Sequence, residues 1–549
     1  MADLVIRGGT VVDGTGAPGR AADVAIEGDR ITAIGSGLAA DRTLDASGCV
    51  VAPGFVDIHT HYDAQVFWDP ALTPSCFHGV TTVVAGNCGF SIAPTRPDHR
   101  DVIARTLENV EDMDPATLAA GIPWDFETHP EYLASVSKHG SALNFGAYVG
   151  HTAVRLYVMG DAAYERKATE DEIARMCQVV REAMEAGAVG LATSFAPTHL
   201  GIDGKPVPSR FAELAEFEAM ARVLAELGRG VVAVTPGQGF FKEMYDFQRR
   251  VGVPMTYTAL LAMPGFWQMG SKLNDEETAK GADVWPQVSC RKLTMQLRMS
   301  DPFQFNQAAS FAALMGKPRE ARVEAYRDPT WRERALAELD RTALPPRWQS
   351  IEVAETERHT ALVDRRVAEL AGERGVTPFD VMLDLSLEEG LATRFRCVQS
   401  NDDEEGIAHL LRSKHVVLGL SDAGAHVGQL CDAPLPTDLL GNWVRERGVL
   451  PLEEAVRKLT SEPAALFRFT DRGVLRPGAC ADVAVFDPDT VAPGPLRRVR
   501  DFPADGDRLT ADAPAGMRHV VVNGVPIREE GEARLDARPG RLVAQGPFG

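Results

Sequence analysis

The segment Phe55-Val56-Asp57-Ile58-His59-Thr60-His61 decides both the fold and the chemistry that this sequence predicts. It begins as an apolar strand and ends on polar residues, and residues two apart on a strand point to the same face. His59 and His61 therefore project together from the carboxyl end of the strand. Two adjacent imidazoles are a poor core motif and good ligands for a divalent metal. The segment predicts a metal site, although a lone histidine would more often be structural.

Further strand candidates follow this segment, and helical stretches lie between several of them. The helix predicted over 169–186 has Asp171 and Glu172 near its start and Gly187 just past its end, as helix termini prefer. Alternating strands and helices are typical of a parallel sheet, either closed as a barrel or open and doubly wound. A barrel has eight places, so one of the nine candidates is false or lies outside it. The strand candidates are 55–61, 80–86, 142–150, 188–194, 230–237, 254–260, 284–289, 395–401 and 416–422.

Both ends of the chain have a different pattern. The first fifty residues alternate with a period of two, and short strands are predicted over 481–486 and 519–523. We expect 1–54 and 469–549 to pair into one small β domain, with the barrel over 55–468. Within the barrel, 291–394 is too long for a loop. Its helical patterns over 318–339 and 355–374 predict an inserted helical lid.

Composition and sequence motifs exclude several classes of partner. The chain has 57 Lys and Arg against 77 Asp and Glu, a net charge of −20, which argues against nucleic acid. Residues 14–19 spell G-x-G-x-x-G, but Pro18 and the strand pattern that follows predict a loop, not a nucleotide site. No apolar run long enough to span a membrane occurs, and no signal peptide is visible. With eight scattered cysteines, we expect a cytoplasmic protein.

Two more polar groups end predicted barrel strands. Cys88 ends the second strand, and zinc accepts sulfur and nitrogen ligands together, although a buried free thiol is the alternative. Asp422 ends the last strand, which neighbours the first around a barrel. A carboxylate there can bind a metal and take a proton from metal-bound water, or can simply cap a turn.

With these motifs in place, the chain resembles the amidohydrolase superfamily, and specifically its D-aminoacylase branch. The resemblance covers nearly the whole chain. It implies a (β/α)8 TIM-like barrel flanked by a small β-sandwich from both termini, and hydrolysis of a C–N bond by metal-activated water. The fourth strand offers no lysine for a carboxylated bridge, and the branch is similar to this chain in placing a cysteine on strand two instead. The motifs are PGFVDIHTH (53–61), GNCGF (86–90), GHTAVR (150–155), GAVGLATS (187–194), LGLSDAGAH (418–426) and GVLRPGACADVAVFD (473–487).

The sequence departs from the family at strands five and six, where the resemblance implies one histidine each. Residues 232–237 and 255–259 contain none, and no histidine occurs between His199 and His359. The remaining donors favour one zinc ion over two, with other divalent metals as alternatives. The predicted ligands are His59, His61, Cys88 and Asp422, with Asp422 also the predicted catalytic proton carrier.

The branch implies N-acyl-D-amino-acid substrates, whose carboxylate needs a cationic or hydrogen-bonding partner. Arg291 and Arg298 could serve, with a solvated lid surface as the alternative. Tyr257 could donate to a carbonyl or pack in the core. His151 and His426 follow strand ends, where each could bind substrate, hold a weak second metal or be structural.

Three functions remain open from the sequence. The first is a metal-dependent hydrolase of an amide or related C–N bond, most like an N-acyl-D-amino-acid deacylase. The second is a specialised amidohydrolase acting on a cyclic amide, an amidine or a biosynthetic intermediate. The third is a catalytically silent barrel used for binding or as a scaffold. The expected partner is a small molecule, and the family's frequent self-association also allows a homo-oligomer.

Overall fold

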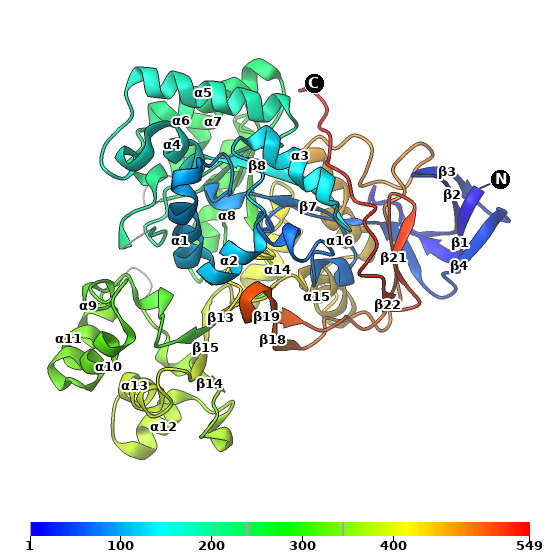
Figure 1. The fold of residues 1–549 in the computed structure, drawn as a ribbon. Coiled ribbons are helices and arrows are strands. Elements are labelled where there is room, and N and C mark those ends of the chain that lie inside the picture. The colour runs from blue at the N-terminus through cyan, green and yellow to red at the C-terminus, as the bar shows by residue number, and fades with distance from the viewer. Residues whose placement is uncertain (1, 202–203, 238–240, 343–344, 549) are drawn as a thin grey trace.

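The computed structural model describes residues 2–201, 204–237, 241–342 and 345–548 (Figure 1). Its centre is an eight-stranded parallel sheet in the order β16-β12-β11-β10-β9-β8-β7-β6. Beyond the strand ends, a parallel bridge joins Thr60 to Ala423 and so links the first strand to the last. The strands are β6 (Phe55–Asp57), β7 (Val80–Ala85), β8 (Asn144–Gly150), β9 (Gly190–Ser194), β10 (Val231–Thr235), β11 (Met255–Tyr257), β12 (Val284–Val288) and β16 (Val417–Leu418).

Eight of the nine predicted strands thus belong to the barrel. The candidate over 395–401 is wrong as a barrel strand, because β15 (Arg394–Ser400) pairs antiparallel with β13 (Leu293–Arg298) in a separate sheet. Its alternating pattern is that of any half-buried strand, so periodicity could not assign it to a sheet.

Helices follow most of the strands and bury one face against the sheet. The helix predicted over 169–186 is α5 (Glu170–Glu185), and its start is fixed by a capping box between Thr169 and Glu172. Side chains alternate along the strands, so Tyr257 packs outward among the helices while Tyr148 belongs to the interior cluster. The surrounding helices are α1 (Arg100–Glu111), α3 (His129–His139), α4 (His151–Met159), α5, α6 (Leu214–Leu227), α7 (Phe241–Val251), α8 (Phe266–Ala279), α14 (Glu404–Arg412), α16 (Leu452–Leu459) and α17 (Ser461–Leu466).

Strands from both ends of the chain form a nine-stranded sheet beside the barrel (Figure 1). Strands β5 and β17 run antiparallel, with Val51 opposite Val485, and join the two ends. Residues 14–19 lie between the first two strands of this sheet, where no helix begins. The strands are β1 (Ala2–Val11), β2 (Arg20–Glu27), β3 (Arg30–Gly35), β4 (Ala40–Asp45), β5 (Val50–Pro53), β17 (Val483–Phe486), β20 (Met517–Val522), β21 (Val525–Glu529) and β22 (Glu532–Ala533).

The chain from β13 to β15 forms a lobe with its own core (Figure 1). The helix predicted over 318–339 is two helices, because Asp328 accepts a hydrogen bond from the Thr330 backbone and Pro329 starts a new helix. Of the stretch predicted helical over 355–374, only the second part is helical. The lobe contains β13, β14 (Glu352–Glu355), β15, α9 (Ala309–Ala312), α10 (Arg319–Arg327), α11 (Pro329–Leu339), α12 (Val367–Arg374) and α13 (Pro378–Glu388).

The lobe is held to the barrel mouth by an arginine pair. Arg498, on the hairpin strand β18 (Leu496–Phe502), pairs with Glu355 of the lobe and donates to the Gly428 carbonyl. Arg394 of β15 donates to the same carbonyl and pairs with Asp507. Among the described residues, no helix is long and apolar enough to cross a membrane.

Candidate metal centre

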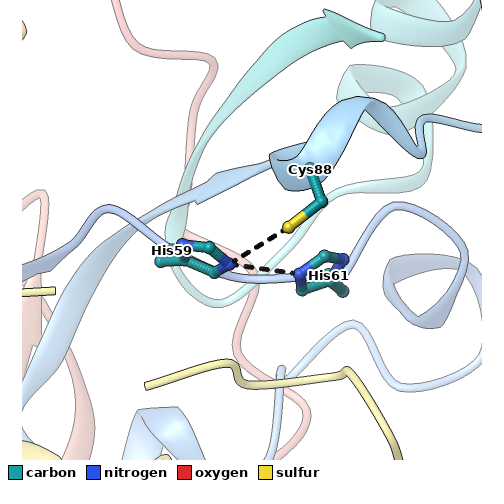
Figure 2. Close-up of side chains that lie close together, drawn as sticks. All are labelled: His59, His61 and Cys88. Carbon is teal, nitrogen blue, oxygen red and sulfur yellow. Dashed lines mark hydrogen bonds between the residues drawn. The ribbon is translucent and has the colours of Figure 1, made fainter. Parts of the chain in front are cut away.

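Three side chains converge at the carboxyl end of the barrel (Figure 2). His59 and His61 follow β6, and Cys88 follows β7, so each projects from a strand end as the sequence predicted. The Nε2 atoms of the two histidines are 3.3 Å apart, and Cys88 Sγ lies 3.8 Å from Nε2 of His59. One donor atom from each residue lies within 4.8 Å of the others. This spacing is that of ligands around a single ion.

Asp422 completes the group from the last strand. Its Oδ1 lies 3.2 Å from Nε2 of His59 and 3.2 Å from Nε2 of His61. The loop that carries it crosses to the first strand, where the His61 backbone N–H donates to the Ala423 carbonyl. Ser421 donates to Asp57 at 2.5 Å and so ties this loop to β6. The four predicted donors are therefore brought together from three strand ends.

Second partners orient both imidazoles. Nδ1 of His59 lies 2.6 Å from Oε1 of Gln287, and Nδ1 of His61 lies 3.0 Å from Oε1 of Glu111. When Nδ1 carries the proton, each Nε2 presents its lone pair to the common point, which is how metal-binding histidines are held. Glu111 and Gln287 are both buried. This donor set fits a divalent ion, zinc among them, because it combines imidazole, thiol and carboxylate groups.

Cys88 is positioned by an unusual backbone. Its φ is 56°, in the left-handed region, and it follows Gly86 at φ 82°, where a Cβ would lie 2.7 Å from the Tyr148 carbonyl. The Asn87 side chain donates to the carbonyls of Ile58 and Thr60, which fixes this turn against the first strand. Positive φ at a non-glycine residue costs energy and is concentrated at functional sites.

Electrostatics in the group favour the charged forms of its members. Burial opposes a charge on Cys88, but hydrogen bonds to His59 and His61 outweigh it and lower the pKa of the thiol. The pKa of Asp422 is likewise held well below its usual value, against burial, by the two histidines. Burial opposes protonation of His59, and bonds to Asp422 and Cys88 raise its pKa to about 10. The donors thus form a mutually stabilising charged cluster.

The positions past strands five and six carry no metal donor. Where the family resemblance implies a histidine after β11, the chain has Thr258, whose Oγ1 lies 3.2 Å from Nδ1 of His59. Thr235, at the end of β10, takes the corresponding place on the fifth strand. Only the Thr258 hydroxyl contacts a proposed ligand, because Thr235 Oγ1 is buried with no hydrogen-bond partner among the described residues.

A cavity of about 230 Å³ lies between the barrel mouth and the lobe. His426, four residues after Asp422, lines this cavity, and so does His199. The Nδ1 atom of His199 lies 2.6 Å from the Ser194 hydroxyl oxygen. Sequence reasoning missed His199, because it lies in a loop five residues past β9 and not at a strand end. Burial, together with the charges of His426 and His61, lowers the pKa of His199 to about 3.

The other predicted substrate residues lie elsewhere. Tyr257 is buried in the outer core and meets Phe241 edge-on. Arg291 is held by Asp432 and Asp438, with Nε 2.6 Å from Asp432 Oδ1. Of the five predicted substrate residues, only His426 lines the cavity in the described part of the chain. His151, Tyr257, Arg291 and Arg298 do not.

His151 is also accounted for by its surroundings. It is fully buried, with Nδ1 2.8 Å from the Thr193 hydroxyl and Nε2 2.9 Å from Glu216. Arg155 neutralises Glu216 from the other side. Both ring nitrogens are therefore satisfied within the barrel wall.

Sequence and structure comparisons identify relatives over the full length. A model of the amidohydrolase family matches residues 42–528. A D-aminoacylase of Alcaligenes xylosoxydans xylosoxydans is 31% identical over 99% of this chain and 98% of its own. A solved structure concerned with the binuclear metal centre of D-aminoacylase, with one-metal activation and second-metal attenuation, has a TM-score of 0.70 at 27% identity, covering 99% of this chain and 100% of that one. A Bordetella bronchiseptica N-acyl-D-glutamate deacylase, complexed with zinc and a phosphonate mimic of the tetrahedral intermediate, has a TM-score of 0.69 at 28% identity, covering 99% of each chain.

Proposed function

The chain belongs to the amidohydrolase family, and from this premise we propose that it removes the acyl group from an N-acylated amino compound at one metal ion. It is a metal-dependent hydrolase of C–N bonds, as its relatives are. The observation that carries the proposal is the convergence of His59, His61, Cys88 and Asp422 on one point. We infer that these four hold the ion and that zinc is the resident metal. The absent donors on strands five and six support one ion over two.

A divalent ion at this point would polarise the scissile carbonyl and lower the pKa of an attacking water. The protein's own groups set up the rest of the reaction. Gln287 and Glu111 keep the imidazoles oriented through their Nδ1 atoms. Asp422 takes the proton of the nucleophilic water and delivers it to the departing nitrogen. Burial would raise the pKa of Asp422, but the two histidines hold it well below its usual value, so the carboxylate is ionised at neutral pH.

The same proposal divides the chain into working parts. We assign 55–468 to the catalytic barrel, and 1–54 with 469–549 to a β-sandwich that supports it. The segment 291–394 would act as a lid over the mouth. The separate core of this segment supports that role, as does the cavity between it and the barrel. The arginine pair Arg394 and Arg498 would be its anchor at the mouth.

A specialised amidohydrolase acting on a cyclic amide or amidine remains the second candidate, favoured by the altered ligand shell at Thr258. Metal content and hydrolysis of an N-acetyl-D-amino-acid panel by the purified chain test the main proposal. We expect about one zinc per chain and turnover of at least one panel member. A protein fully active without metal would contradict the proposal. A zinc-loaded protein inert on the panel but active on cyclic amides would favour the second candidate.

A further inference from the structure

We propose that His199 is a further catalytic residue, whose Nε2–H donates a hydrogen bond to the carbonyl oxygen of the scissile amide. The inference rests on the proposed hydrolase function and adds to it a residue outside the set of metal donors. Three features of the molecule carry it: the position of the imidazole ring, the hydrogen bond that fixes its tautomer, and its neutral state.

His199 belongs both to the surroundings of the candidate metal centre and to the wall of the cavity. Its ring packs edge-on against Phe90, two residues after Cys88, with the ring centroids 5.0 Å apart. The charges of His61 and Asp422 act on the same ring. The side chain also lines the cavity of about 230 Å³ between the barrel mouth and the lobe. A substrate that reaches the metal donors from this cavity would therefore meet the imidazole.

Close packing brings the loop after β9 beside the turn that carries the cysteine. A Cβ on Gly89 would lie 2.9 Å from the Ala192 carbonyl of β9, so the ends of the second and fourth barrel strands are in contact through that turn. The loop then turns back, because the His199 backbone N–H donates to the Ala196 carbonyl at 3.2 Å. Backbone contacts thus hold the half-buried ring close to the strand ends.

Ser194 determines which ring nitrogen of His199 carries the proton. The serine hydroxyl is buried, lies 2.6 Å from Nδ1, and already accepts a hydrogen bond from the Ala196 backbone N–H at 3.1 Å. No other partner of this hydroxyl is present among the described residues, so the hydroxyl donates its hydrogen to Nδ1. Nε2 then carries the ring proton. In the described structure Nε2 has no hydrogen-bond partner, and it keeps accessible surface that an incoming group can reach.

The His199 ring is neutral at neutral pH. Burial, together with the charges of His426 and His61, lowers the pKa of His199 to about 3. A neutral imidazole still donates one hydrogen bond, and it does so without adding a positive charge beside a metal ion. A fixed donor of this kind stabilises an oxygen atom most strongly when negative charge develops on it.

That charge develops when water attacks the amide. The water oxygen bonds to the carbonyl carbon, and the electron pair of the C=O double bond moves to the carbonyl oxygen, which becomes negatively charged. His199 donates to this oxygen throughout and loses no proton. Asp422 takes the proton that the water releases and delivers it to the nitrogen as the C–N bond breaks and the C=O bond forms again.

Two substitutions separate hydrogen bonding by His199 from packing. His199→Phe keeps a flat ring against Phe90 and removes the donor, so kcat on the best N-acetyl-D-amino-acid substrate should fall about 10²–10³-fold, with KM and zinc content little changed. His199→Gln keeps an N–H and should recover about tenfold or more of that loss. His415→Phe is the matched control and should change nothing, because His415 is exposed, meets Trp285, and precedes β16 at the opposite end of the barrel.

The kinetic result can contradict the inference in three ways. An unimpaired kcat in His199→Phe would show that the ring does not take part in the reaction. An effect confined to KM would make His199 an anchor for another part of the substrate. Equal losses in His199→Phe and His199→Gln would assign the ring to packing against Phe90.

Histidine NMR provides a readout that does not depend on turnover. In zinc-loaded protein with isotope-labelled histidine, the His199 signals are identified by their loss in His199→Gln, and they should show a neutral ring protonated on Nε2. The methylphosphonamidate analogue of N-acetyl-D-methionine, a tetrahedral mimic, should move this N–H signal downfield. A proton on Nδ1, or an N–H signal that the compound does not move, would overturn the inference. If the signal moves but no N-acetyl amino acid is hydrolysed, the hydrolase proposal fails alone.

Discussion

Two buried histidine–carboxylate groups lie at strand ends of the same barrel. They differ in the contacts that the two ring nitrogens of each histidine make. His151 gives one nitrogen to Thr193 and the other to Glu216. His61 gives Nδ1 to Glu111 and turns Nε2 toward Asp422 and the neighbouring His59. Burial and a carboxylate are common to both groups. The difference is that only in the second group do nitrogen atoms of two histidines converge with a thiol and a carboxylate on one point.

The pKa values of His151 and His61 shift in opposite directions. Burial lowers the pKa of His151, and its contact with Glu216 does not offset burial and the smaller effect of the nearby Arg155 charge. The pKa of His61 is raised well above its usual value, because Glu111, Asp422 and Cys88 outweigh burial. A buried histidine in a carboxylate's company is therefore not evidence of a functional site by itself. What identifies the site is that the second nitrogen of His61 meets donor atoms of His59, Cys88 and Asp422 at one point.

The largest expected effect distinguishes Asp422, which we assign to the reaction, from Glu216, which we do not. Asp422→Asn should lower kcat/KM by about 10²–10⁴-fold, because the amide cannot accept the proton of the attacking water. The matched change Glu216→Gln should lower stability and leave kcat/KM of the folded enzyme nearly unchanged. Steady-state kinetics with zinc analysis of each variant provide the measurement. An unimpaired Asp422→Asn enzyme would remove Asp422 from the reaction.

The next effect is on the free energy of unfolding and concerns the buried pair of Arg155 and Glu216 beside His151. Arg155→Met leaves the Glu216 charge buried without its cation and should cost about 3–5 kcal/mol. Arg500→Met is the matched control, since Arg500 pairs with Asp505 at the surface, where a pair is worth about 0–1 kcal/mol. Urea unfolding of the two variants would measure the difference. Similar losses would mean that the buried pair contributes no more than an exposed one.

A smaller effect tests the support of the metal centre. Glu111→Gln removes the carboxylate behind His61 and should weaken zinc binding about 10–100-fold. Competition with a chelator measures the affinity directly, and excess zinc should restore activity. Glu108→Gln, on the same helix, should leave zinc affinity unchanged, because no contact between Glu108 and a proposed ligand is seen in the described structure. Loss of activity that zinc cannot restore would instead assign Glu111 to the reaction.

The donors at the strand ends could be predicted from the sequence because their positions follow from the residues of each strand and from parallel topology. A strand of period two places His59 and His61 on one face, and parallel topology brings Cys88 and Asp422 to the same end. Glu111 could not be found this way. In the sequence it lies at the end of α1, far along the chain from any strand end. It contacts His61 only because that helix packs against the barrel mouth.

Gln287 and β15 were hidden for related reasons. Gln287 is an unremarkable polar residue inside a strand until the barrel closes it onto His59. The β15 segment has the periodicity of a barrel strand, but its hydrogen bonds go to β13 and β14. Local pattern determines that a strand forms, while long-range pairing determines where it goes. The helix break at Pro329 was readable in principle, since Asp-Pro is a helix start signal.

The smallest effect is a pH dependence carried by His151. Because its folded pKa is lowered from 6.5, the unfolded chain binds a proton below pH 6.5 that the folded chain does not. The unfolded state is then favoured as the pH falls, so this histidine makes stability decline toward acid by at most about 1.4 kcal/mol per pH unit. His151→Gln should remove that contribution and flatten the slope of the unfolding free energy below pH 6.5. His129→Gln should flatten it independently, since burial lowers the pKa of His129 to about 4. An unchanged slope in His151→Gln would mean that His151 is protonated in the folded barrel, which would make its pair with Glu216 ionic and reduce the contrast with His61.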